Sequence, residues 1–222
     1  MIQEIQDKIR FQVNKFIFDN GYAPTTGDLS EIMNIDENEV KTGLTKLAEN
    51  HAIVLHPGTF GIWVAHPFSL APTLFWVESG GRKWWGNCTW CSLGIAALTK
   101  ADTRIFTKMS GEKDPLQIDI VGGKIVQKEL LVHFPVPAKK FWDNVVYTCS
   151  VMLTFQNEVQ VDDWCKRHRI NKGEVYSIEK IWELARLWYG NYLDPAWTRK
   201  TPEYAASLFK QTGLVSDFWK LE

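Results

Sequence analysis

Three cysteines in this sequence have the residue type and spacing for metal or thiol chemistry. Cys88 and Cys91 are three residues apart in the stretch Trp-Gly-Asn-Cys-Thr-Trp-Cys-Ser-Leu, a spacing that lets both thiols face one ligand from the first turn of a helix. Free backbone N–H groups in that turn lower a thiol pKa and favour the thiolate, the form that binds soft metals and attacks electrophiles. The same spacing occurs in zinc sites and in thioredoxin-like redox centres, so it leaves the kind of chemistry open.

Two further cysteines lie downstream. Cys149 stands in the run Val-Val-Tyr-Thr-Cys-Ser-Val-Met-Leu, which we predict to be a strand, and a single thiol in such a run is more often a small core residue than a ligand. Cys165 lies among charged residues in a predicted helix, and we interpret it as structural. For four cysteines in a chain without secretory features, metal binding or thiol chemistry is a better expectation than a disulfide framework.

The first 65 residues have the element order of a winged helix. Apolar residues three and four apart predict a helix over 2–20. Thr25 or Thr26 can cap a second helix ending at Met33, and Asp36 can cap a third that runs to Asn50. The apolar runs 52–55 and 61–65 flank a His-Pro-Gly-Thr turn and predict a hairpin. We therefore predict a winged-helix-like three-helix domain over residues 1–65.

The pattern after residue 65 predicts an α+β domain over residues 66–222. Strand-like runs occupy 73–77, 117–121, 124–127, 130–134 and 145–155. The Gly-Gly pair at 122–123 is a good signal for a two-residue hairpin. We predict helices over 92–98, 161–168, 177–192 and 202–210. The whole chain is thus predicted to be an α+β protein in which a mixed β-sheet domain with flanking helices follows the winged-helix-like part.

Composition and charge narrow the classes of function. Hydrophobic residues make up 45% and charged residues 23% of the chain, the balance of an ordinary globular protein. No stretch approaches the roughly 20 apolar residues of a membrane span, and the amphipathic start has no signal-peptide core. We therefore expect a cytoplasmic protein without a membrane partner.

The charge distribution also argues against a nucleic-acid partner. A winged helix commonly places its third helix in the major groove of DNA. Here residues 1–65 hold five Lys or Arg against nine Asp or Glu, and the formal net charge of the chain is -1. Because phosphate binding needs basic residues, we expect no nucleic acid to bind, and interpret the first domain as a packing domain.

The order of several motifs resembles the alkylmercury lyase family. The motifs are the run His-Pro-Phe-Ser-Leu-Ala-Pro-Thr over 66–73, then Cys88, then Cys149, then Asp163-Trp164 and Lys166-Arg167-His168. The resemblance covers most of the chain, including its winged-helix-like start. It implies an enzyme in which two cysteines and an aspartate three residues after the first cysteine form the site. Matched residue by residue, Cys88 and Cys149 take the cysteine positions, and Cys91 stands at the aspartate position.

The resemblance also implies the reaction. Two thiolates coordinate mercury and weaken its bond to carbon, while a proton is delivered to the leaving carbanion; thiolates suit so soft a metal. Cys88 and Cys149 are then the metal-binding nucleophiles. Cys91 is either a proton donor, whose unperturbed pKa of about 8.5 is far above that of a carboxylic acid, or a third metal ligand that shifts the substrate to another organometal or prevents turnover.

The same resemblance sets the expected ligands and partners. No organic cofactor is expected, and mercury or another soft metal ion is bound as substrate or product. The partners are a small organometallic substrate and a thiol reductant or metal-accepting protein that removes the product. The cysteine at position 91 is also consistent with a divergent branch of organometallic lyases.

Other interpretations remain open on the residues alone. A structural zinc site would use Cys88, Cys91, Cys149 and His133. A thioredoxin-like redox centre lacks the expected βαβ surroundings, and a metal-sensing winged-helix regulator is the strongest class that is not an enzyme. Trp84, Trp85 and Trp90 line either a pocket for the organic group or the core. Four histidines show no metal-ligand spacing and are interpreted as surface or capping residues: His51, His56, His66 and His168.

Overall fold

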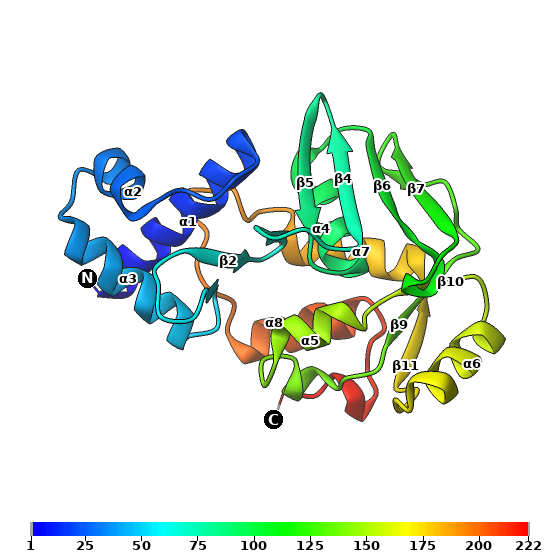
Figure 1. The fold of residues 1–222 in the computed structure, drawn as a ribbon. Coiled ribbons are helices and arrows are strands. Elements are labelled where there is room, and N and C mark those ends of the chain that lie inside the picture. Colours follow the sequence, from blue (N-terminus) through cyan, green and yellow to red (C-terminus); the bar gives the residue numbers. More distant parts are fainter. Residues whose placement is uncertain (1, 222) are drawn as a thin grey trace.

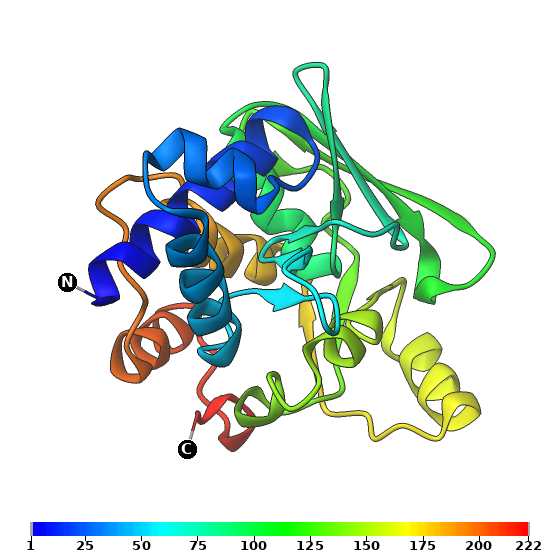
Figure 2. The ribbon, with the colours of Figure 1, turned by 60° about the vertical axis from the view of Figure 1, so that its left-hand side comes forward.

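Three helices form the amino-terminal part of the computed structural model, which describes residues 2–221 and the side chains of residues 4–221. They are α1 (Ile2–Asn20), α2 (Thr26–Met33) and α3 (Glu37–Glu49), and Figure 2 shows them packed together. Thr25 and Asp36 are the N-caps of α2 and α3, each in a capping box that satisfies free backbone N–H groups. All three predicted helices are confirmed.

An antiparallel sheet of eight strands follows (Figure 1), in the order β1-β2-β3-β5-β4-β6-β7-β8. Its strands are β1 (Val54–Leu55), β2 (Ile62–Ala65), β3 (Phe68–Ser69), β4 (Phe75–Ser79), β5 (Arg82–Gly86), β6 (Thr103–Lys108), β7 (Pro115–Val121) and β8 (Lys124–Ile125). The predicted hairpin β1–β2 is present, and Val64 of β2 pairs with Ser69 of β3. The sheet therefore continues across residue 65. The predicted domain boundary at this residue, and the description of residues 1–65 as a winged-helix-like domain, stay predictions.

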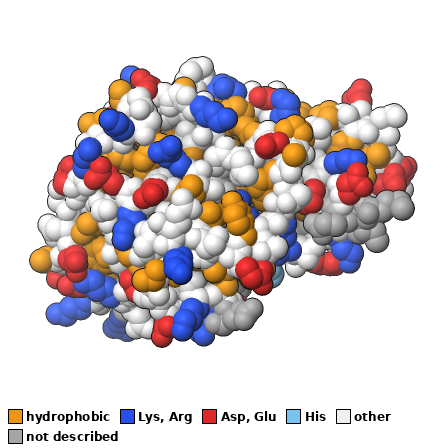
Figure 3. All heavy atoms as spheres, turned by 180° about the vertical axis from the view of Figure 1, so that it is seen from behind, with side chains coloured by type: hydrophobic (Ala, Val, Ile, Leu, Met, Phe, Trp, Pro, Cys, Tyr) orange, Lys and Arg blue, Asp and Glu red, His pale blue; other side chains and the backbone are white. Residues whose placement is uncertain are grey.

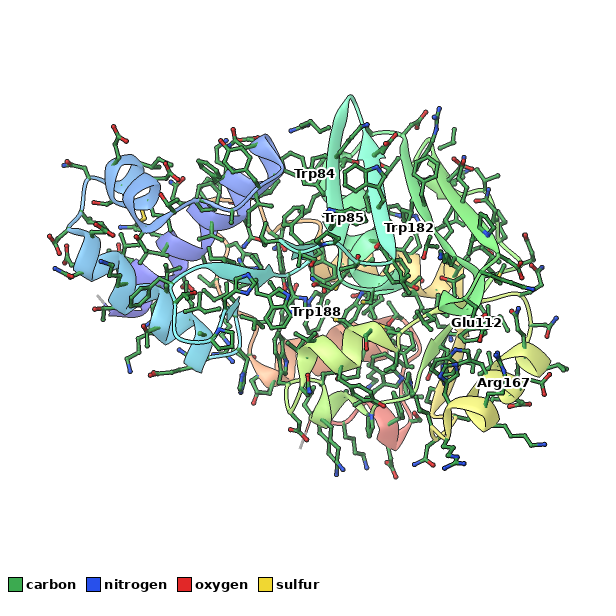
Figure 4. All side chains as sticks on the ribbon, viewed as in Figure 1. Trp84, Trp85, Glu112, Arg167, Trp182 and Trp188 are labelled. Atoms are coloured by element: carbon green, nitrogen blue, oxygen red, sulfur yellow. The ribbon has the colours of Figure 1, made fainter. Side chains whose placement is uncertain are left out.

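A second sheet lies below the first in Figure 1, in the order β10-β9-β11. It consists of β9 (Leu131–Phe134), β10 (Thr154–Phe155) and β11 (Glu174–Ser177), and α6 (Glu158–His168) follows β10. Figure 4 shows Arg167 of α6 pointing toward Glu112, which follows the 3-10 helix η1 (Met109–Gly111); a 2.5 Å ion pair joins their side chains. This ion pair links α6 to the loop between β6 and β7.

Two helices pack on one face of the large sheet. Residues 89–98 of α4 (Thr89–Thr99) are all buried, and α4 lies between the sheet and α7 (Ile178–Tyr189). The remaining helices are α5 (Val145–Ser150), α8 (Pro202–Gln211), η2 (Ala138–Lys140) and η3 (Asp217–Trp219). The predicted helices over 92–98, 161–168, 177–192 and 202–210 are thus confirmed with small changes at their ends.

The predicted strand over 145–155 is wrong. Residues Val145–Ser150 form α5, because the Asn144 side chain caps the helix by accepting a hydrogen bond from the Tyr147 N–H at 3.0 Å. Only Thr154–Phe155 are in strand conformation. The cap outweighs the strand preference of the β-branched residues in this run. Strands β3, β5, β6 and β11 were not predicted.

The charges on the surface and the lengths of the helices are relevant to the kinds of partner that the protein could have. In the view of Figure 3, basic and acidic side chains are interspersed, without a broad area of one sign. Within residues 2–221, no helix combines the length and the apolar character that crossing a bilayer requires.

Candidate metal centre

The structure brings Cys88, Cys91 and Cys149 together in the interior. Cys88 is the N-cap of α4, Cys91 lies in the first turn of the same helix, and Cys149 lies on α5; their exposed fractions are 0%, 2% and 7%. The Cys91 N–H donates to the Cys88 Sγ at 3.3 Å, and the Cys149 Sγ lies within 4.8 Å of the Cys91 Sγ. We call these three side chains the thiol cluster.

Hydrogen bonds next to α5, which carries Cys149, hold this helix against the start of α4, which carries Cys88 and Cys91. The Thr89 N–H and Oγ1 both donate to the Met152 carbonyl, at 3.3 and 3.2 Å. The Thr89 Oγ1 also lies 2.9 Å from the Thr154 Oγ1. Because these bonds join the start of α4 to the segment just after α5, they hold Cys149 beside Cys88 although 61 residues separate the two in the sequence.

His66 belongs to the site. The sequence analysis interpreted it as a surface or capping residue, and that interpretation is wrong. It follows β2, precedes a cis peptide bond to Pro67, and places its Nδ1 3.5 Å from the Cys91 Sγ. The only group of three potential metal ligands found within the described residues is His66, Cys91 and Cys149, whose ligand atoms all lie within 4.8 Å of one another. In the sequence, the signal that could have identified His66 as a site residue was its place at the start of the His-Pro-Phe-Ser motif.

Tyr189 of α7 is a second residue of the site that the sequence did not reveal. Its hydroxyl oxygen lies 3.7 Å from the Cys91 Sγ. Burial, together with the negative charges of Cys91 and its neighbours, raises the pKa of the Tyr189 hydroxyl well above its usual value. The tyrosine therefore stays protonated and can donate to a thiolate at Cys91.

The three thiols have different pKa values. Burial raises the pKa of Cys91, but hydrogen bonds from Cys149 and Cys88 and the proximity of His66 outweigh it, so the resulting pKa lies well below the usual value. Burial raises the pKa of Cys88 well above its usual value. The pKa of Cys149 is raised as strongly, by its hydrogen bonds to the other two thiols and then by burial. The first proton is thus lost from Cys91, and the expectation of a lowered pKa at Cys88 is wrong.

The zinc site with His133 as fourth ligand does not form. The His133 Nε2 is hydrogen-bonded to the Lys172 carbonyl and lies 3.7 Å from the Cys165 Sγ. His133 and Cys165 therefore pack against each other and not against the thiol cluster. The other histidines lie on aromatic rings: His51 on Trp142, His56 on Trp63 and His168 on Trp164.

The tryptophans near the cysteines mostly pack the core. Trp84, labelled close to α1 in Figure 4, stacks on Phe18 and donates its indole N–H to the Ile17 and Phe18 carbonyls. Trp90 packs against Trp188 and against Tyr189 of the site. Trp85 is half-buried and lies across the strand pair from Trp76. Trp84 and Trp90 thus position α1 and Tyr189.

A surface groove of about 510 Å³ has Trp142, a neighbour of His66, in its lining. It lies between β1 and the start of α5, and its lining includes His51, Trp142, Val145 and Val146. The Trp142 ring packs with its edge against His66, with ring centroids 5.2 Å apart. Trp142 therefore links the groove to the half-buried imidazole of His66.

The fold and the site together define an α+β protein with a buried centre of three thiols and an imidazole. The family model for alkylmercury lyase matches residues 68–190, which is more than half of the chain, and the chain belongs to the alkylmercury lyase family. The resemblance inferred from the motifs is thereby confirmed.

A solved structure shares the fold. The crystal structure of the mercury-bound form of MerB2 is similar with a TM-score of 0.69, and the match covers 84% of this chain and 92% of that chain at 20% identity. No curated protein matches this chain significantly.

Proposed function

We propose that this protein cleaves the carbon–mercury bond of small organomercurials by thiolate-assisted protonolysis. Membership of the alkylmercury lyase family supports the reaction class. The observation that carries the assignment to particular residues is the thiol cluster, in which the Cys91 and Cys149 Sγ atoms lie within 4.8 Å of each other and the Cys91 N–H donates to the Cys88 Sγ. The pKa is lowered at Cys91 and raised at Cys88 and Cys149. One nucleophile and two proton donors are then present in one buried site.

The first step is exchange of a ligand on mercury. The Cys91 thiolate attacks the metal of R–Hg–X, a sulfur–mercury bond forms, and X leaves with its electron pair. Mercury favours this exchange because thiolate is the softest ligand in the protein. The low pKa of Cys91 makes the attacking form available without an external base.

The second step breaks the carbon–mercury bond. Cys88 or Cys149 transfers its thiol proton to the carbon, the electron pair of the carbon–mercury bond forms the new C–H bond, and the resulting thiolate becomes the second mercury ligand. Both candidate donors belong to the same cluster as the attacking Cys91, and a general acid must lie close to the atom that it protonates. A carboxylic acid at position 91 is then not required, and Cys91 acts as a metal ligand in this scheme.

Release of the product needs an external acceptor. Hg²⁺ held by two or three buried thiolates dissociates slowly, so we propose that a thiol reductant or a metal-accepting protein removes it by ligand exchange. All four cysteines are free in the structure, which is the form that the cytoplasm maintains. We therefore place the reaction there, without an organic cofactor, and assign it to residues 66–222.

The test is release of hydrocarbon under anaerobic conditions. Reduced protein is incubated with methylmercury and with phenylmercury, and methane or benzene is measured by gas chromatography, beside Cys91→Asp and Cys165→Ser variants. Release by the wild type and by Cys165→Ser supports the proposal. Mercury retained without hydrocarbon would instead assign the chain to binding or sensing of thiophilic metals, and release by Cys91→Asp alone would show that the carboxylic acid is needed.

A further inference from the structure

The thiol cluster has a fourth potential ligand of a different chemical type. The His66 Nδ1, the Cys91 Sγ and the Cys149 Sγ all lie within 4.8 Å of one another. Cys88 is outside this group, although its Sγ accepts a hydrogen bond from the Cys91 N–H. The described residues therefore offer one ligand set of two sulfurs and one nitrogen, with the Cys88 sulfur beside it.

The position of His66 favours a role as a ligand over a role in packing. Its Nε2 is buried and has no hydrogen-bond partner, so the contact with Cys91 is the polar contact that orients the ring within the described residues. Trp142 covers the ring on the side of the groove. A half-buried imidazole directed at two thiols, with its other nitrogen unused, has the arrangement of a metal ligand.

A ligand set that mixes sulfur with nitrogen suits other metals than sulfur alone does. Mercury is soft and is well served by sulfur alone, whereas zinc is a borderline ion that takes imidazole and thiolate together in tetrahedral sites. Two cysteines and one histidine with an open fourth position form a known catalytic type of zinc site. Cys91 and Cys149 each supply a thiolate ligand once zinc binds, because metal binding releases the thiol proton.

We propose that His66, Cys91 and Cys149 form a zinc site, and that zinc and organomercurials compete for the two shared thiols. Zinc binding itself stands on the ligand geometry, and the competition rests on the proposed lyase function. The fourth position is filled by water, an external thiolate or Cys88. Zinc in this site leaves fewer thiols free to attack an organomercurial, so it slows the lyase without touching the rest of the fold.

Cobalt is the probe for the ligand set. Metal-free, reduced protein is titrated with Co²⁺ under anaerobic conditions, and the thiolate-to-cobalt charge-transfer band and the visible bands report sulfur ligation and tetrahedral geometry. Zn²⁺ is then added to displace cobalt and to measure the zinc affinity. We expect one equivalent of tetrahedral cobalt in the wild type and displacement by zinc.

Variants of the histidines identify the nitrogen ligand. His66→Gln is expected to weaken zinc binding by at least about tenfold, while Hg²⁺ still binds to the intact thiols. His66→Cys restores a ligand and is expected to recover tight binding, which keeps the test informative if His66→Gln folds poorly. His56→Gln changes a histidine that stacks on Trp63 away from the cluster, and it should bind zinc like the wild type.

The outcomes separate this proposal from the lyase proposal. Absence of stoichiometric cobalt and zinc binding, or unchanged zinc affinity in His66→Gln, overturns the zinc site whatever the hydrocarbon assay gives. Hydrocarbon release is measured on metal-free protein, so its failure counts against the lyase function alone. If both zinc binding and turnover occur, added zinc should raise the apparent KM for methylmercury in the wild type and much less in His66→Gln; an unchanged KM contradicts the competition.

Discussion

The Tyr189 ring of α7 packs directly on Gly94 of α4, and its hydroxyl lies 3.7 Å from the Cys91 Sγ one turn earlier on the same helix. A Cβ atom at position 94 would lie 2.4 Å from the ring, far inside contact distance. The missing side chain at Gly94 thus determines how closely α7 approaches the thiol cluster.

Replacing Gly94 with alanine tests this contact. Gly94→Ala is expected to lower the free energy of unfolding by about 1–3 kcal/mol, the usual cost of overpacking a core, and to slow hydrocarbon release because Tyr189 is displaced. Urea unfolding gives the stability. Gly27→Ala in α2, where a Cβ meets only ordinary contact, is the matched control and should be at least as stable as the wild type.

The thiols of the cluster are expected to be indispensable for hydrocarbon release. The fourth cysteine, Cys165, is not. Cys88→Ser and Cys149→Ser should each lower the rate of hydrocarbon release by about 10²-fold or more, because each removes a mercury ligand or the general acid. Cys165→Ser changes a thiol that packs against His133 and should stay within about twofold of the wild type. Full activity in Cys88→Ser would refute the assignment.

Cys91 should be the thiolate of the resting enzyme. Its pKa lies well below the usual value while those of Cys88 and Cys149 lie well above it, so a pH titration of thiolate absorbance should show one early phase. Cys91→Ser is expected to remove that phase, and His66→Gln should move it to higher pH. Retention of the early phase in Cys91→Ser would assign the thiolate to another residue.

The same ionisation affects stability in a defined direction. The native pKa of Cys91 lies below that of the unfolded thiol, so the native state binds fewer protons. This contribution is fully present above the unfolded pKa of the thiol and is lost as the pH falls through the native pKa.

Lys200 is expected to destabilise the native state near neutral pH. Its Nζ is buried without a hydrogen-bond partner among Trp188, Tyr192 and Trp197. Burial, together with the nearby charge of Arg10, lowers the pKa of Lys200 to about 7. The unfolded lysine keeps its proton to much higher pH, so the stability of the wild type rises with pH above about 7 through this group.

Lys200→Met measures the effect. The variant is expected to be more stable than the wild type by at least about 1 kcal/mol at pH 6.5, since a buried unpaired charge is removed. The difference should shrink as the pH rises toward 9. Thermal unfolding of both proteins across this range gives the comparison, and a difference that stays constant with pH would contradict the low pKa.

Local signals in the sequence were sufficient for much of the fold. Caps and apolar spacing predicted the three amino-terminal helices, and a run of small apolar residues predicted the helix over 92–98, because those signals act within a few residues. The strand predicted around Cys149 failed because β-branched residues dominated the pattern and the cap at Asn144 was overlooked. Strand β5, with the sequence Arg-Lys-Trp-Trp-Gly, does not alternate between polar and apolar residues, so periodicity could not find it.

The candidate site was predictable in part. The three cysteines followed from their spacing and from the family resemblance. His66 and Tyr189 reach Cys91 from segments 25 and 98 residues away, and no local pattern marks such contacts. The order of the pKa values depends on which thiol receives hydrogen bonds from the other two, which only the three-dimensional arrangement reveals.

The pairing of Val64 with Ser69 has a consequence for how this chain can be divided. A fragment starting at residue 66 would lose β1 and β2 and leave β3 as an exposed, hydrogen-bonding edge, with the buried Phe68 brought to solvent. Unprotected edges of this kind recruit strands from other molecules. Expression of the carboxyl-terminal part alone should therefore yield aggregates, because the amino-terminal segment supplies the strands that cover this edge.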